Sequence, residues 1–148
     1  TDEMIVNKLY SASQAGVKIR LIIRGINVLK TELSEISENI QAISIVDRFL
    51  EHSRVYLFGN NNDPKVFISS ADWMPRNLDH RIEVVCPIYD EHIKSELIKM
   101  LDFEWNDNKK ARNLRLDKMN NYVESSGLDL RSQFAKYHYF SEVSKLHQ

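Results

Sequence analysis

The stretch "VKIRLIIRG", residues 17–25, constrains the fold more than any other part of the sequence. Apolar and basic side chains alternate along most of it, and a period of two is typical of a β-strand with one buried face. The residues expected on the buried face are Val17, Ile19, Leu21 and Ile23. We therefore predict a strand that ends at Arg24 and Gly25.

Further runs extend this strand into an α/β pattern. Before it, apolar residues at helical spacing predict a helix over residues 4–12, which Gly16 is suited to end. After it, short β-runs at 55–58 and 66–69 flank the turn-forming sequence "GNNNDPK", and "RIEVVCPIY" is a later apolar run. Because the turn makes a hairpin, we predict an α/β fold with a mixed β-sheet flanked by helices.

Helices are also predicted between and after these strands. Ser37, near the end of the polar loop 26–39, is a suitable N-cap for a helix that ends at His52. The inner stripe of this helix comprises Ile40, Ile43, Val46 and Leu50. Two more helices are expected at about 91–103 and 105–112, and apolar residues at a loose helical spacing predict another in the polar tail 113–148.

Length, charge and cysteine content exclude several classes of protein. A chain of 148 residues suits one domain. No apolar run approaches the roughly 20 residues that cross a bilayer, and a net charge of −1 gives no general attraction to nucleic acid or to an anionic membrane. The single Cys86 excludes an internal disulfide and fits a reducing cytosol. Because the chain starts inside a helical pattern without methionine, we expect a fragment.

Two residues at predicted element ends are candidates for phosphate recognition. Arg24 lies at the carboxyl end of a predicted strand, where open α/β sheets present ligand-binding groups, and its planar guanidinium matches two phosphate oxygens. His52 follows a predicted helix whose dipole, with Glu51, would stabilise an imidazolium. From spacing alone, a solvated strand-end charge and a helix cap are the commoner roles of such residues.

A third candidate is the stretch 68–84, which contains Ser69, Ser70, Arg76 and Arg81. Its hydroxyls and arginines could surround an anion, or the stretch could be a turn in which Asp72 is the cap and Trp73 packs against the core. Metal binding has little support, because neither His80 nor His92 has a ligand partner at a typical spacing. We expect Cys86 to be a core residue and not a nucleophile.

Three stretches together resemble one family. They are "AGVKIRLIIRGI", "SENIQAISIVDRFLEHSRVYLF" and "VFISSADWMPRNLDHRIEVVCPIYD", in this order and spacing. They look like the C-terminal catalytic domain of bacterial polyphosphate kinase of the long-chain type, and "KKAR" at 109–112 also fits. The resemblance covers residues 1–112 as one phospholipase D-like domain that lacks its preceding sister domain, and leaves 113–148 as a helical C-terminal extension.

The resemblance to phospholipase D itself is partial. "HSR" at 52–54 stands where phospholipases have His-x-Lys, and "SSADW" at 69–73 stands where they have Gly-Ser-x-Asn. Arg54 replaces the lysine, and Gly59 stands in place of the usual aspartate. These departures argue against phosphodiesterase chemistry and leave a kinase as the expected activity.

The family resemblance implies reversible transfer of the terminal phosphate of ATP to inorganic polyphosphate through a phosphohistidine. It places that histidine and the arginines associated with Mg²⁺ in the sister domain, outside this chain. It assigns nucleotide binding to Arg24 and His52, with His52 also catalytic. It further implies ATP, ADP and polyphosphate as ligands, contacts with sister domains, a homo-oligomer in full length and a cytoplasmic location, with membrane association through partners left open.

Two other functions remain alternatives. The chain could be a non-catalytic phosphate-binding or assembly module, in which the aromatic tail around 137–140 packs on other domains or subunits. It could also be a phospholipase-like phosphodiesterase, which Gly59 argues against.

Overall fold

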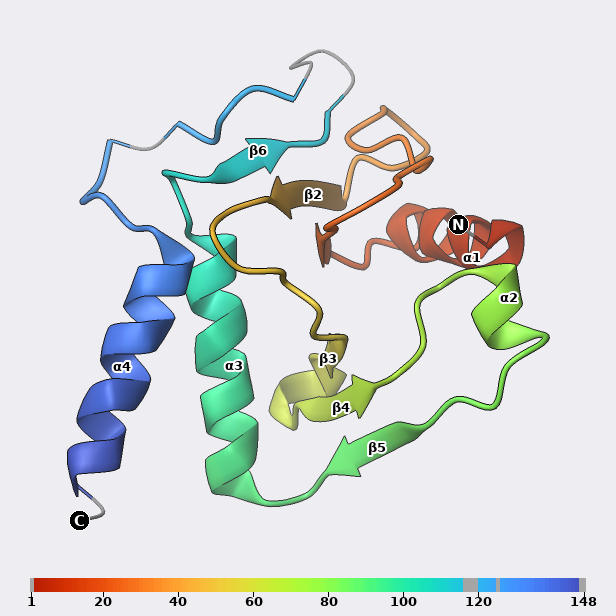
Figure 1. Ribbon diagram of the computed structural model, residues 1–148. Coiled ribbons are helices and arrows are strands. Elements are labelled where there is room, and N and C mark those ends of the chain that lie inside the picture. Colours follow the sequence, from red (N-terminus) through yellow and green to blue (C-terminus); the bar gives the residue numbers. More distant parts are fainter. Residues whose placement is uncertain (1, 116–119, 125, 147–148) are drawn as a thin grey trace.

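A computed structural model describes residues 2–115, 120–124 and 126–146 (Figure 1). Its helices and strands are, in chain order, α1 (Glu3–Gln14), β1 (Ile19–Ile22), β2 (Ile40–Ile45), β3 (Val55–Phe58), β4 (Lys65–Ser69), α2 (Pro75–Leu78), β5 (Val85–Ile88), α3 (Glu91–Trp105), β6 (Ala111–Asn113) and α4 (Ser132–Leu146). A short 3₁₀ turn lies between β3 and β4. The predicted class, mixed α/β with helices flanking β-structure, is confirmed, but the strands form two sheets and not one.

The first sheet has the order β1-β2-β6. β1 runs parallel to β2, and β6 runs antiparallel to β2. Because β2 is central and covered on both faces, its apolar side chains are buried whichever way they point, as Ile40, Ala42, Ile43 and Ile45 are. The core of this sheet joins Ile43, Ile45 and Ala111 to side chains that include Trp105.

The predicted helix that ends at His52 is therefore wrong. Ser37 does not cap a helix, because its buried hydroxyl donates to the carbonyl of Lys30 at 2.6 Å and accepts from the amide of Leu33 at 3.2 Å, which closes the loop before β2. The three-residue spacing of Ile40 and Ile43 arises in a strand that is buried on both faces, so it carries no helical meaning.

The second sheet, β3-β4-β5, is antiparallel and contains the predicted hairpin. α3 lies over one face, where Leu97 and Met100 share a hollow with Val55 and Ile68. β5 confirms the predicted apolar strand, but Cys86 is exposed and not a core residue, because β5 is an edge strand.

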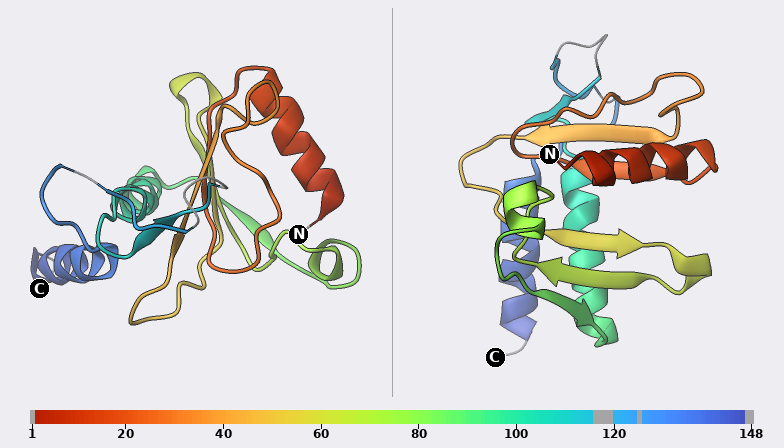
Figure 2. Two further views of the ribbon diagram at one scale, coloured as in Figure 1. Left: turned by 90° about the horizontal axis from the view of Figure 1, so that it is seen from above. Right: turned by 90° about the vertical axis from the view of Figure 1, so that its right-hand side faces the viewer.

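Two helices run side by side at one end of the molecule, as Figures 1 and 2 show for α3 and α4. The ring of Phe103 meets that of Tyr139 edge-on at 5.7 Å, and the Tyr139 hydroxyl donates to Glu96 at 2.9 Å. α4 confirms a helix in the tail. The predicted helix at 105–112 is wrong, because Asp107 accepts from the amides of the next residues and turns the chain into β6.

α1 agrees with its prediction. Asp2 accepts from the amide of Ile5 at 2.9 Å as the N-cap, and Gly16 adopts a positive φ of 86° just after the helix, a conformation that favours glycine. Among the residues described, no helix combines the length and apolar composition that crossing a membrane requires.

Candidate functional site

Arg54 is the centre of a polar cluster at the start of β3. Its Nε donates to Oδ1 of Asp72 at 2.9 Å and its Nη2 donates to Oδ2 at 3.1 Å, which is a bidentate ion pair. Its Nη1 lies 3.0 Å from Nδ1 of His52 and donates to the His52 carbonyl oxygen at 3.2 Å. One guanidinium therefore fixes a carboxylate and an imidazole together.

The contact between Arg54 and His52 decides where the imidazole proton lies. A guanidinium can only donate, so Nδ1 of His52 acts as the acceptor. The remaining ring proton is then on Nε2, which makes the exposed His52 a donor at that atom.

The backbone context of His52 also differs from the prediction. His52 lies in the segment 46–54 between β2 and β3 and not at the end of a helix, so no helix dipole acts on it. Nor does Glu51 face the imidazole, because its carboxylate accepts hydrogen bonds from Lys136 and Gln133 of α4. The histidine is positioned by Arg54 instead.

Strand pairing explains why Arg54 meets Asp72. The amide of Ser69 donates to the Arg54 carbonyl at 2.9 Å and extends the β3-β4 ladder to the turn that carries Asp72. The Tyr56 hydroxyl donates to the Ala71 carbonyl at 3.1 Å. Trp73 stacks on Tyr56 at 5.4 Å, which confirms its packing role. The carboxylate of Asp72 pairs with Arg54 and does not cap the next turn.

Arg24 is half-buried and lies two residues beyond the end of β1. Hydrogen bonds from Arg54 lower the pKa of Asp72 below the usual aspartate range, and burial opposes this shift. Arg24 and His52 also lower the pKa of Asp72, by smaller amounts. Arg24 and His52 are thus close enough to influence the same carboxylate. His52 is also joined to Asp72 through Arg54, which contacts both side chains.

The stretch 68–84 offers fewer free anion-binding groups than its composition suggests. Ser69 accepts from the amide of Ala71 at 3.0 Å, and Ser70 donates to Glu83 while it accepts from the amide of Val84 at 3.0 Å. These bonds engage both hydroxyls in closing the loop. The predicted Arg76 and Arg81 are exposed, and Arg81 acts on Glu83, whose pKa is lowered first by its hydrogen bond with Ser70.

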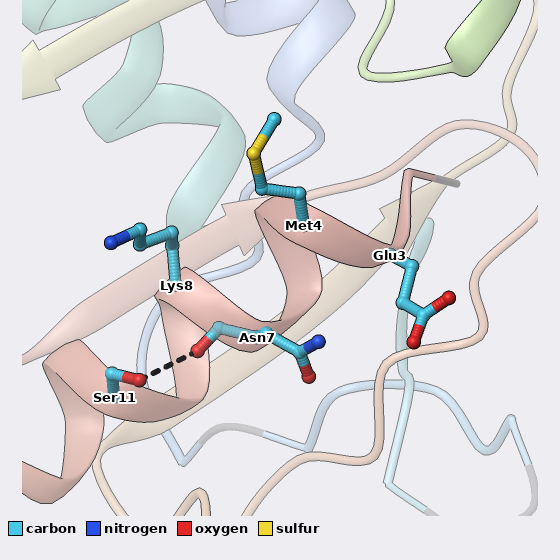
Figure 3. A pocket seen from close by; sticks show the side chains of 5 residues that line it. All are labelled: Glu3, Met4, Asn7, Lys8 and Ser11. Atoms are coloured by element: carbon cyan, nitrogen blue, oxygen red, sulfur yellow. Dashed lines mark hydrogen bonds between the residues drawn. The ribbon is translucent and has the colours of Figure 1, made fainter.

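A hollow of about 350 Å³ adjoins the cluster. It lies between the start of β3, the end of β4 and α3, and its polar wall includes His52, Arg54 and Ser69. A larger hollow of about 510 Å³ lies on α1, where Figure 3 shows five side chains, among them Met4 and Lys8, on the outside of a single helix. The hollow on α1 contains none of the predicted site residues, so we place the site beside His52.

The described residues do not fit a magnesium site. They contain no group of three or more histidine, cysteine, aspartate or glutamate residues that could hold a metal ion, and both oxygens of Asp72 are engaged by Arg54. His80 and His92 are both exposed.

Asp72 is the site residue that pattern reasoning missed. The sequence did carry a signal for it. Arg54 and Asp72 stand at the lysine and asparagine positions of the phospholipase-like pattern, and both depart from that pattern. The two departures are in contact, so the arginine-aspartate ion pair occupies the place of the lysine and asparagine.

Comparisons with known proteins agree on one family. The model described as polyphosphate kinase C-terminal domain 2 matches residues 1–133. Proteins named polyphosphate kinase are 52% identical in Vibrio vulnificus strain YJ016 and 44% identical in Escherichia coli K12, each over 97% of this chain. A crystal structure of polyphosphate kinase from Porphyromonas gingivalis has a TM-score of 0.94 and 41% identity over 99% of this chain.

The chain is much shorter than these relatives. It spans 21% of the two curated proteins and 22% of the solved chain. The family model also extends past residue 112, at which the sequence predicts a domain boundary. That position lies inside β6, which pairs with the central strand β2.

Proposed function

The chain belongs to the polyphosphate kinase family, and we propose that it supplies one half of a kinase site that transfers the terminal phosphate of ATP reversibly to inorganic polyphosphate. The observation that carries this proposal is the position of Arg24 and His52. The family resemblance assigns both to the nucleotide, and both act on the carboxylate of Asp72.

Phosphoryl transfer makes defined demands on such a site. Its transition state is loose and spreads negative charge over the equatorial oxygens, so a protein contributes mainly position and charge. We assign Arg24 to bind phosphate oxygens of the nucleotide through its planar, permanently charged fork.

His52 has a different role in the proposal. The hydrogen bond that Nδ1 accepts leaves the ring proton on Nε2, and the ring is exposed. Nε2 can therefore donate a hydrogen bond to an oxygen on which charge builds. Arg54 and Asp72 position this imidazole and do not need to touch the nucleotide.

The rest of the reaction belongs to residues outside this chain. We place the phosphorylated histidine and the magnesium site in a sister domain of a longer polypeptide, and a homo-oligomer in the cytoplasm is part of the same proposal. On this basis the isolated chain is inactive, because it lacks the nucleophile. Residues 113–148 are proposed as a C-terminal extension of the domain.

The test uses the full-length enzyme with Arg24→Ala and His52→Ala. Loss of a positioned donor or of a charge clamp lowers kcat by about 100-fold or more, in the forward and reverse directions. Arg20→Ala is the matched control, because Arg20 is an exposed arginine of β1, the strand before Arg24, and its guanidinium lies over Trp105. Near-normal turnover of both folded variants would refute the assignment.

A further inference from the structure

Lys136 of α4 joins two carboxylates from distant parts of the chain. Its Nζ donates to Oε1 of Glu104 at 2.6 Å and to both oxygens of Glu51 at 3.2 and 3.1 Å. The side chains are 13% exposed for Lys136, 20% for Glu51 and 12% for Glu104. Burial disfavours the charged amine, but the bonds to Glu104 and Glu51 outweigh burial and raise the pKa of Lys136.

α4 holds the same segment at two more points. Gln133 accepts from the amide of Phe49 at 2.9 Å and donates to its carbonyl at 2.8 Å. Arg131, just before α4, donates to both oxygens of Asp47 at 2.8 and 2.6 Å, and the side chain of Asp47 is only 2% exposed. The contacts fall at Asp47, Phe49 and Glu51, which lead directly to His52.

The segment 46–52 has little apolar anchorage of its own. Its large apolar side chains, Val46, Phe49 and Leu50, are 71%, 64% and 74% exposed. Burial of such side chains normally fixes a loop, and here it contributes little. The polar contacts from α4 are therefore the main restraint on the backbone that precedes His52.

We propose that Lys136 is a positioning residue, which acts through Glu51 to hold His52 in its productive place. This inference rests on the proposed function of His52. A displacement of a catalytic group by about 1 Å can cost two orders of magnitude in rate, so a restraint one residue away from the imidazole has catalytic weight. The C-terminal extension thereby becomes part of the site without touching the nucleotide.

The experiment measures kcat and KM of the full-length enzyme with Lys136→Met, alone and combined with His52→Ala. Methionine keeps the volume of the side chain but leaves Glu51 and Glu104 without their cation. We expect kcat to fall by about 10-fold or more, with a smaller change in KM for ATP. In the His52→Ala background the same substitution should change kcat by less than about twofold, because the group that it positions is gone.

Matched variants separate positioning from general destabilisation. Lys136→Arg keeps the charge and should restore most of kcat, and Lys145→Met removes an exposed pair with Glu142 on the same helix and should change nothing. Gln133→Met tests the same restraint without leaving a buried charge, and should lower kcat in the same direction if Lys136→Met fails to fold.

The outcomes distinguish this inference from the function on which it rests. Normal kcat in Lys136→Met and Gln133→Met, with His52→Ala impaired, overturns the positioning role and leaves the proposed function standing. Additive losses in the double variant overturn it too, because Lys136 would then act independently of His52. Normal turnover in His52→Ala overturns both proposals.

Discussion

Replacing Arg54 by lysine tests whether one guanidinium sets the state of the site. The substitution keeps the positive charge next to Asp72 but replaces a planar fork with a single ammonium group. Arg54 makes four hydrogen bonds, two to the Asp72 carboxylate and two to His52. A lysine at this position can keep one contact with Asp72 and loses the geometry that reaches Nδ1 of His52.

The size of the effect follows from these contacts. A hydrogen bond to a charged group contributes about 1.5–3 kcal/mol when it is well buried. The side chains of Arg54 and Asp72 are 18% and 33% exposed, so solvent screening reduces that contribution. We expect Arg54→Lys to lower the free energy of unfolding of the chain by about 1–2 kcal/mol.

We expect Arg54→Lys to affect catalysis as well as stability. Without Nη1, nothing in the described contacts of His52 favours the proton on Nε2, so the donor is present only part of the time. We expect kcat of the full-length enzyme to fall about 10- to 100-fold, as for a hydrogen-bond donor to developing charge that is held incorrectly.

Urea unfolding of the chain and steady-state kinetics of the full-length enzyme measure the two effects. Arg20→Lys is the control, since it makes the same chemical change at an exposed arginine. If Arg54→Lys keeps kcat within about twofold of the parent while His52→Ala remains impaired, Arg54 does not govern the imidazole and the reasoning is wrong.

Three further predictions concern the stability of the chain in urea unfolding. Ile40→Ala should lower the free energy of unfolding by about 2–5 kcal/mol, because Ile40 is 0% exposed in the central strand, whereas Ile26→Ala at a 74% exposed site should have little effect, and equal losses would contradict the burial of β2. Asp107→Ala should cost about 2–4 kcal/mol because four backbone amides lose their acceptor, while Asp129→Ala, at a surface pair, should cost less than about 1 kcal/mol. Hydrogen bonds from a guanidinium lower the pKa of Asp47, so its stabilising contribution is present above the free-aspartate value of about 3.9 and is lost as the pH falls from there through the folded-state value. Asp47→Asn should therefore be less stable at pH 7 and less sensitive to acid, and an unchanged acid dependence would argue against this pair.

The strands that sequence predicted well are those with local signals. Alternation around Ile19 and Leu21 marked β1, and the glycine, asparagine and proline between β3 and β4 marked the hairpin. The sequence predicted a helix in place of β2 because β2 has no such local signal. Ile40 and Ile43 are both buried because the strand is covered on two faces, so the apolar residues of IQAISI show no period of two and their three-residue spacing fits a helix equally well.

β6 could not be predicted from its own residues. It contains only Ala111, Arg112 and Asn113, and it becomes a strand by pairing with β2, about 70 positions earlier in the sequence. The register between distant strands is a property of the folded chain, so a local pattern does not contain it.

The candidate site, like the fold, was predicted in part from the sequence. The family resemblance selected Arg24 and His52, and both lie within electrostatic range of the Asp72 carboxylate. Pattern reasoning assigned His52 to a helix end, and this error followed directly from the error over β2. The ion pairs of Arg54 with Asp72 and of Lys136 with Glu51 cross 18 and 85 positions in sequence, and the periods of helices and strands do not connect residues so far apart.

The supports of His52 also determine when the site can mature during protein synthesis. Asp47 and Glu51 are translated 84 and 85 residues before Arg131 and Lys136. A nascent chain that has left the ribosome only through β5 carries the histidine, but its central strand has one neighbour and an open edge. Contacts over such separations form late in folding. A polypeptide whose synthesis ends before α4 therefore lacks the contacts that restrain the segment before His52, and it is exposed to proteases and to misassembly.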